Sequence, residues 1–181
     1  MIIEKKNQGE NVVKTLTMPI YKSGRNVTMD NFFTTLNLSR YLLEQNITII
    51  GTVKKNKTFL PKNFQSNIGE AGECKFIFQD EATLVKYNAK KNKSVVSLSA
   101  QHSQPEIRED TGKPEIIHYY NETKGGVDTL DQIVRHFSCK RPTRRWPMAI
   151  FYNIVDIAAY NAFLLYIEKK PSIQNYSQKA I

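Results

Sequence analysis

The spacing of apolar residues along this chain changes from segment to segment, and each spacing predicts a type of element. A nearly continuous β-branched run at residues 47–53 predicts a strand in the middle of a sheet that is covered on both faces. Shorter runs predict further strands at residues 26–29, 75–78, 83–87 and 94–99. Apolar residues at helical spacing predict helices at about residues 10–19, 32–45 and 146–167.

These elements predict an α/β fold whose core is divided into two segments. The first core segment covers residues 1–54 and the second, with its helices, covers residues 116–170. Between them, residues 55–115 carry the three short strands in a stretch rich in Lys, Asn, Gly and Ser, which indicates a small antiparallel β-rich insertion. The polar residues 171–181 are expected to form a flexible tail.

The stretch of residues 121–132 combines a turn signal with a helical pattern. Gly125 and Gly126 predict a tight turn, after which helical spacing continues to about residue 138. One helix face is apolar (Val127, Leu130, Val134 and Phe137), and another gathers Asp128, Asp131 and Arg135. A carboxylate held where a loop becomes a helix suits a divalent-metal ligand, with room for a phosphate beside the glycines. The alternative is a capped helix with a solvated acidic face.

Asp30 has two possible roles. It directly follows the extended run 26–29, at the strand end where open sheets with parallel strands place their ligands. It could equally be the N-cap of the next helix. That helix is expected to place Phe33, Leu36, Leu42 and Leu43 in the core.

The charge pattern favours a polyanion as partner. The chain has 181 residues and a net charge of +9, with the excess gathered in clusters. Such clusters favour nucleic acid through counterion release, although a basic face can also serve solubility alone. The last cluster is a loop in which arginines precede a tryptophan, an arrangement that can hold phosphate and stack on an unpaired base. It contains Lys140, Arg141, Arg144, Arg145 and Trp146. Alternatively, Trp146 packs at the start of a helix whose first position is Pro147.

Two further features limit the cellular setting. Residues 146–167 are long enough to cross a membrane, but Asp156 near the midpoint favours a helix buried against the sheet. Cys74 and Cys139 have no histidine at zinc-ligand spacing, and the first residues are too polar for a signal peptide. Free thiols in a reducing compartment are therefore expected, without membrane insertion.

Three motifs together resemble the piggyBac family of DNA transposases. They are residues 24–34 (GRNVTMDNFFT), residues 119–131 (YYNETKGGVDTLD) and residues 145–149 (RWPMA), and the resemblance covers nearly the whole chain in order. It implies a ribonuclease H-like catalytic domain with three metal-binding aspartates. Asp30 matches the second, Asp128 the third, and Asp131 a further acidic position. No residue here matches the first aspartate, which in the family lies upstream of this segment.

The resemblance implies Mg²⁺-dependent cleavage and transfer of DNA strands, with Asp30 and Asp128 as catalytic metal ligands. The residues expected to contact DNA are Lys124, Arg135, Lys140, Arg141, Arg144, Arg145 and Trp146. Expected partners are transposon ends, target DNA, and a second copy or an intact transposase, in the nucleus. Without the first aspartate we expect a fragment that is inactive alone. The alternatives are a non-catalytic derivative that binds DNA or protein, and an unrelated α/β hydrolase or structural module.

Overall fold

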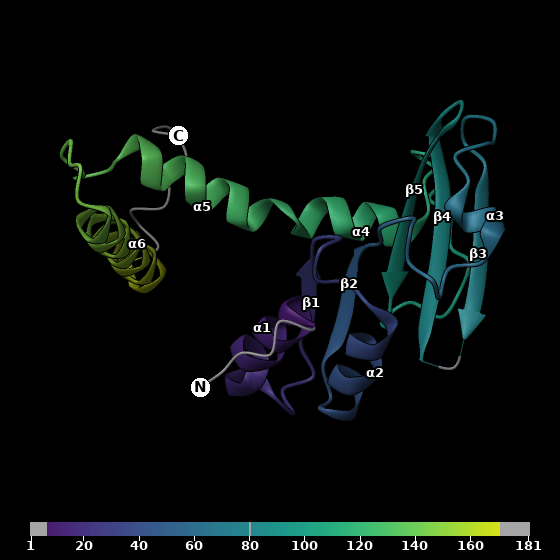
Figure 1. Cartoon of the computed structure of the whole chain (residues 1–181), viewed down its shortest axis with the longest axis horizontal. Coiled ribbons are helices and arrows are strands. Elements are labelled where there is room, and N and C mark those ends of the chain that lie inside the picture. Colours follow the sequence, from purple (N-terminus) through teal and green to yellow (C-terminus); the bar gives the residue numbers. More distant parts are fainter. Residues whose placement is uncertain (1–6, 80, 171–181) are drawn as a thin grey trace. The chain divides into compact units, whose positions relative to one another are not determined.

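A computed structural model describes residues 7–79 and 81–170, which divide into two compact units (Figure 1). The first unit ends at Lys124 and contains the sheet, and the second begins at Gly125 and contains two helices. The predicted tail, residues 171–181, lies outside the described residues. The predicted boundaries at residues 54 and 115 stay predictions.

The first unit is built on one sheet with the strand order β1-β2-β5-β4-β3 (Figure 1). The strands are β1 (Asn26–Met29), β2 (Thr48–Thr52), β3 (Cys74–Gln79), β4 (Ala82–Lys90) and β5 (Lys93–Ser99). β1 runs parallel to β2, whereas all other neighbours are antiparallel. Each strand overlaps a run predicted from the apolar pattern. The strands of the predicted insertion extend the same sheet, because β5 pairs directly with β2.

Close approach between β2 and the end of β1 depends on Gly51. A Cβ atom at this position would lie 2.6 Å from the carbonyl oxygen of Met29 and would overlap the hydroxyl of Thr34. Glycine therefore lets the turn that follows β1 pack directly on the middle of β2.

Two helices of the first unit correspond to those predicted at about residues 10–19 and 32–45, and the others were not predicted. The helices are α1 (Gln8–Thr17), the 3₁₀ helix η1 (Met18–Ile20), α2 (Leu36–Glu44), α3 (Lys62–Gln65) and α4 (Glu115–Thr123). α2 begins later than predicted, because its N-cap is Thr35, whose hydroxyl oxygen accepts a hydrogen bond from the N–H of Leu38 at 3.2 Å. The alternative in which Asp30 caps this helix is therefore wrong.

The first unit has two core clusters, and the larger one lies between α2 and the sheet. Leu38 and Leu42 on α2 are fully buried, as are β2 residues such as Ile49. The predicted core positions Phe33 and Leu36 are partly buried and pack against this cluster, which also contains Val13, Met29, Ile47, Leu84, Val96 and Leu98. The prediction for Leu43 is wrong, since this residue points away from the buried face of α2 and is 36% exposed.

The second unit consists of α5 (Gly125–His136) and α6 (Trp146–Lys169), which contact each other. The prediction of a tight turn at Gly125 and Gly126 is wrong, because both glycines lie within α5 and neither has a positive φ. A helix can contain two glycines here because the apolar positions that follow keep helical spacing and α5 packs against α6.

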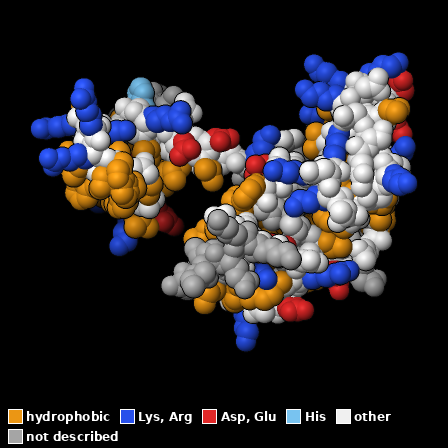
Figure 2. All heavy atoms as spheres, in the orientation of Figure 1, with side chains coloured by type: hydrophobic (Ala, Val, Ile, Leu, Met, Phe, Trp, Pro, Cys, Tyr) orange, Lys and Arg blue, Asp and Glu red, His pale blue; other side chains and the backbone are white. Residues whose placement is uncertain are grey.

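α6 is apolar around most of its circumference and largely exposed. Ile154 is 60% exposed and Leu165 is 61% exposed, and only Asp156 and Ile167 are buried. Within its own unit α6 is therefore mostly exposed, and its burial against the sheet stays a prediction. Figure 2 shows hydrophobic side chains gathered over α6, with Lys and Arg side chains around them. By length and composition α6 could cross a membrane, with a mean hydropathy of 1.5, which for a single helix is weak evidence.

Candidate metal and nucleic-acid site

Asp30 directly follows β1, at the carboxyl end of the parallel pair β1 and β2. Its main-chain carbonyl accepts hydrogen bonds from the N–H groups of Phe33 at 3.1 Å and Thr34 at 3.2 Å, and from the Thr34 hydroxyl at 3.0 Å. These bonds fix the turn through the backbone, while the residue is exposed. The carboxylate is therefore not used by the turn and remains open to a ligand.

The end of α4 is held against β1. The hydroxyl of Thr28 on β1 donates to Oγ1 of Thr123 at 2.8 Å, and Thr123 in turn donates to the carbonyl of Tyr119 at 2.8 Å. The last turn of α4 thus lies beside the strand that leads to Asp30. The sequence motifs contain both threonines, but nothing in their spacing predicted that they meet.

The start of α4 is held by a second polar contact. Arg108 Nε donates to Glu115 Oε2 at 2.6 Å, and Arg108 Nη1 lies 3.0 Å from Nε2 of His118. The hydrogen bond from the guanidinium, followed by its positive charge, lowers the pKa of the Glu115 carboxyl. Glu115 therefore stays ionised and paired with Arg108 at neutral pH.

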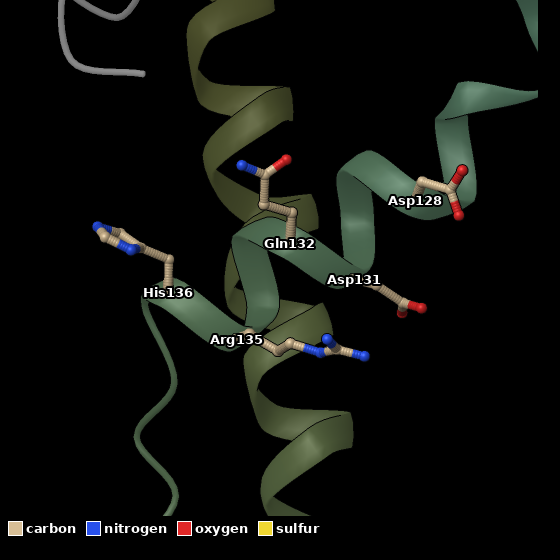
Figure 3. A pocket seen from close by; sticks show the side chains of 5 residues that line it. All are labelled: Asp128, Asp131, Gln132, Arg135 and His136. Atoms are coloured by element: carbon tan, nitrogen blue, oxygen red, sulfur yellow. The ribbon is translucent and has the colours of Figure 1, made fainter.

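On α5, the predicted acidic face lines an open hollow (Figure 3). Asp128 lies in the first turn of the helix, and Asp131 and Arg135 follow at helical spacing. Gln132 and His136 complete the lining. Asp128, Asp131 and Arg135 are exposed, and their grouping on one face agrees with the pattern in the sequence.

The two predicted metal ligands belong to different units, Asp30 to the first and Asp128 to the second. Within residues 7–79 and 81–170, no group of three or more His, Cys, Asp or Glu side chains forms a metal cluster. That Asp30 and Asp128 share a metal ion stays a prediction.

The basic loop, residues 139–145, joins α5 to α6 and is exposed along its length. Trp146 opens α6 with Pro147 in the first turn, and its side chain is 74% exposed. Trp146 is thus not packed against the described residues, which leaves its indole ring open to a partner.

Of the other predicted DNA contacts, Lys124 ends α4 with its ammonium 5.6 Å from the centre of the Tyr120 ring. Arg135 and the loop residues Lys140, Arg141, Arg144 and Arg145 are exposed.

The sequence pattern did not identify Asp156 as a residue that holds the start of the basic loop. Asp156, on α6, accepts hydrogen bonds from the Ser138 hydroxyl at 2.5 Å and from the Cys139 N–H at 2.9 Å. The bond from Ser138 and the bond from Cys139 lower the pKa of the Asp156 carboxyl, and the same carboxylate raises the pKa of the Cys139 thiol. The only sequence signal was a lone carboxylate in an apolar helix. Both cysteines are free, with Cys139 exposed.

Comparison with known proteins assigns the chain to a family of transposases. A family model described as Transposase IS4 matches residues 3–163, and the chain belongs to this transposase family. Among solved structures, the chain is similar to the piggyBac transposase in a cryo-EM structure of its synaptic complex with hairpin DNA. The two share 42% sequence identity with a TM-score of 0.87, over 94% of this chain and 36% of that one.

These matches confirm the predicted piggyBac resemblance and the predicted partial ribonuclease H-like α/β fold. The chain spans about a third of the length of the piggyBac transposase, 36%.

Proposed function

We propose that the chain forms part of the catalytic domain of a piggyBac-like transposase, acting in DNA strand cleavage and transfer. The observation that carries the proposal is 42% identity over 94% of the chain, which includes the three motifs. Because the similar protein is in a complex with hairpin DNA, we infer that transposon ends and target DNA are also the partners of this chain.

Asp30, Asp128 and, as an accessory, Asp131 are the proposed metal-binding carboxylates. Carboxylate oxygens are the protein ligands that Mg²⁺ prefers. All three residues are exposed, and within the described residues no Lys or Arg forms an ion pair with any of them. Their negative charge is therefore available to a cation. When bound, Mg²⁺ would polarise the phosphodiester and stabilise the leaving oxygen during in-line attack.

The other residues of the site act on the DNA backbone. We propose that Lys124, Arg135, Lys140, Arg141, Arg144 and Arg145 bind phosphates and that the exposed ring of Trp146 stacks on an unpaired base. Phosphate contacts fix the position of the DNA without reading its sequence. In this proposal the carboxylates hold the metal ions for strand cleavage, and the basic residues position the DNA.

The resemblance implies a first aspartate to which no position of this sequence corresponds. We therefore expect the chain by itself to bind metal and DNA without completing strand transfer. A shared metal ligand would be missing from the site, and a two-metal mechanism needs it to hold both ions.

A second candidate is a non-catalytic derivative that binds DNA or pairs with an intact transposase or a second copy. The exposed apolar side chains of α6 and the exposed basic loop favour it, because neither needs a metal ion. Both candidates place the chain in the nucleus.

Manganese relaxation enhancement distinguishes the two candidates. It is measured on the chain, on Asp30→Ala and Asp128→Ala, and on Asp110→Ala, an exposed loop carboxylate that serves as control. The catalytic proposal predicts that both site variants weaken binding and the control does not. Binding that no site variant changes would reject the metal site and leave the non-catalytic derivative.

Salt-dependent binding to a fluorescent DNA hairpin tests the basic loop. Replacing Arg141, Arg144 and Arg145 by Gln should make the slope of log K against log salt shallower by about 2–3, since each lost phosphate contact changes it by about 0.9. The matched control replaces Lys90, Lys91 and Lys93 at the turn between β4 and β5 by Gln. An equal effect in the control would reject the loop as the DNA-binding site.

A further inference from the structure

We propose that Asp156 is a positioning residue, which holds the basic loop 139–145 in the shape that contacts the DNA backbone. The inference rests on the proposed DNA-binding role of that loop. It goes beyond that role by assigning a task to a carboxylate in the middle of an otherwise apolar helix.

The contacts of Asp156 reach three consecutive residues at the start of the loop. One carboxylate oxygen accepts the Cys139 N–H at 2.9 Å, and the other accepts the Ser138 hydroxyl at 2.5 Å. The Ser138 oxygen in turn accepts the N–H of Lys140 at 3.0 Å. Asp156 thereby anchors the backbone of Cys139 directly, the side chain of Ser138 directly, and the backbone of Lys140 through the Ser138 hydroxyl.

The loop is anchored at its other end as well. Arg145 is the N-cap residue of α6, and its N–H donates to the hydroxyl oxygen of Thr143 at 3.1 Å. Asp156 follows Arg145 by about three helical turns, about 16 Å along the axis. Fully extended, residues 139–145 reach about 21 Å. The loop is therefore held between two points of one rigid helix whose axial separation is about three quarters of the loop's extended length, which limits the shapes its arginines can sample.

Such restriction favours binding because less conformational entropy is lost when the phosphates are contacted. The alternative role for Asp156, plain electrostatics, acts in the opposite direction. A carboxylate behind a basic loop weakens its attraction for DNA, so removing only the charge should strengthen binding. A carboxylate that is 9% exposed is also unfavourable in an apolar helix unless it is hydrogen-bonded, as it is here.

Loss of the anchoring contacts should weaken DNA binding, whereas loss of the negative charge should strengthen it, so DNA affinity distinguishes the two roles of Asp156. Hairpin binding is measured on the full chain with Asp156→Ala, with Asp156→Asn, which keeps an acceptor for the Cys139 N–H, and with Glu168→Gln, a charge-matched control near the end of α6. We expect about a 3- to 10-fold weaker affinity for Asp156→Ala, as for the loss of one or two phosphate contacts. Asp156→Asn should bind as tightly as the unmodified chain or more tightly, like Glu168→Gln. Affinity that is unchanged or higher in Asp156→Ala would overturn the proposal.

Amide hydrogen exchange measures how firmly Asp156 holds the loop in the absence of DNA. The N–H groups of Cys139 and Lys140 should be protected in the unmodified chain and in Asp156→Asn, and should exchange faster in Asp156→Ala. Ser138→Ala leaves α6 intact and should release Lys140 but not Cys139, which keeps the test valid if Asp156→Ala does not fold. Equal protection in all variants would overturn the proposal. If the unmodified chain does not bind the hairpin, the proposed function fails, while the exchange pattern still decides whether Asp156 holds the loop.

Discussion

The two units differ in where their apolar side chains lie. In the sheet unit, α2 and the central strands bury Leu38, Leu42 and Ile49 completely. In the helical unit, α6 leaves side chains such as Ile154 and Leu165 more than half exposed, and its loop is fixed by polar contacts with Asp156. The comparison teaches that the first unit is stabilised mainly by burial, whereas local hydrogen bonds define the loop of the second.

Truncating one apolar side chain in each unit is the strongest test of this contrast. Leu42→Ala should lower the free energy of unfolding by about 2–5 kcal/mol, because it leaves a cavity in a fully buried cluster. Ile154→Ala should change it by no more than about 0.5 kcal/mol, because the side chain is 60% exposed. Urea unfolding followed by circular dichroism measures both. Equal losses would show that α6 is covered in solution.

Glycines in the two units should respond to alanine with opposite signs. Gly51→Ala should destabilise the sheet unit by about 1–3 kcal/mol, because the new Cβ would overlap Thr34 and press on the Met29 carbonyl. The measurement is the midpoint of urea unfolding, with near-ultraviolet circular dichroism as a check on packing. A neutral result would mean that β1 and the turn after it shift easily, which would weaken the case for a fixed Asp30.

In the helical unit, Gly125→Ala and Gly126→Ala should each stabilise α5 by about 0.5–1 kcal/mol. A Cβ atom at either position meets no atom within 4 Å. Thermal unfolding measures the gain, and hairpin binding is measured on the same variants. Higher stability combined with weaker binding would show that DNA needs the space left by the glycines, whereas lower stability would contradict their helical conformation.

The smallest expected effect concerns the acid response of α4. The folded-state pKa of Glu115 is lowered by Arg108, so the stabilisation is present above the unfolded pKa, about 4.3, and is lost as pH falls through the lower folded value. The difference in stability between the unmodified chain and Glu115→Gln should therefore be largest near neutral pH and vanish in acid. Glu109→Gln, an exposed neighbour, is the control. A difference that stays constant as the pH falls into the acid range would reject the ion pair as its cause.

Local patterns predicted much of the fold and less of the site. One β-branched run and four shorter strand-like runs predicted the strands of the described chain, because strand propensity and alternation are local properties. The start of α2 was missed because Thr35, not Asp30, meets the N–H of Leu38, and cap choice depends on backbone geometry. The motifs identified Asp30 and Asp128 as candidates, but not the contacts of Thr28 with Thr123 or of Asp156 with Ser138, because contacts between distant residues leave no periodic signal. The exposure of α6 within its own unit was not predicted, because its composition resembles that of a buried helix.

The strand order β1-β2-β5-β4-β3 has a consequence for how the chain folds. β3, β4 and β5 are consecutive antiparallel neighbours, so their pairing closes only short loops and should be fast. β2 must find β5 across the whole intervening segment, and β1 joins the sheet only through β2. We expect the β3–β5 meander to be the folding nucleus. β1 pairs with β2 over a shorter separation, as Asn26 lies opposite Thr48, so these two strands should join the meander together when β2 pairs with β5. The edge strand β1, which Asp30 directly follows, would then be connected to the rest of the sheet only through this late β2–β5 pairing.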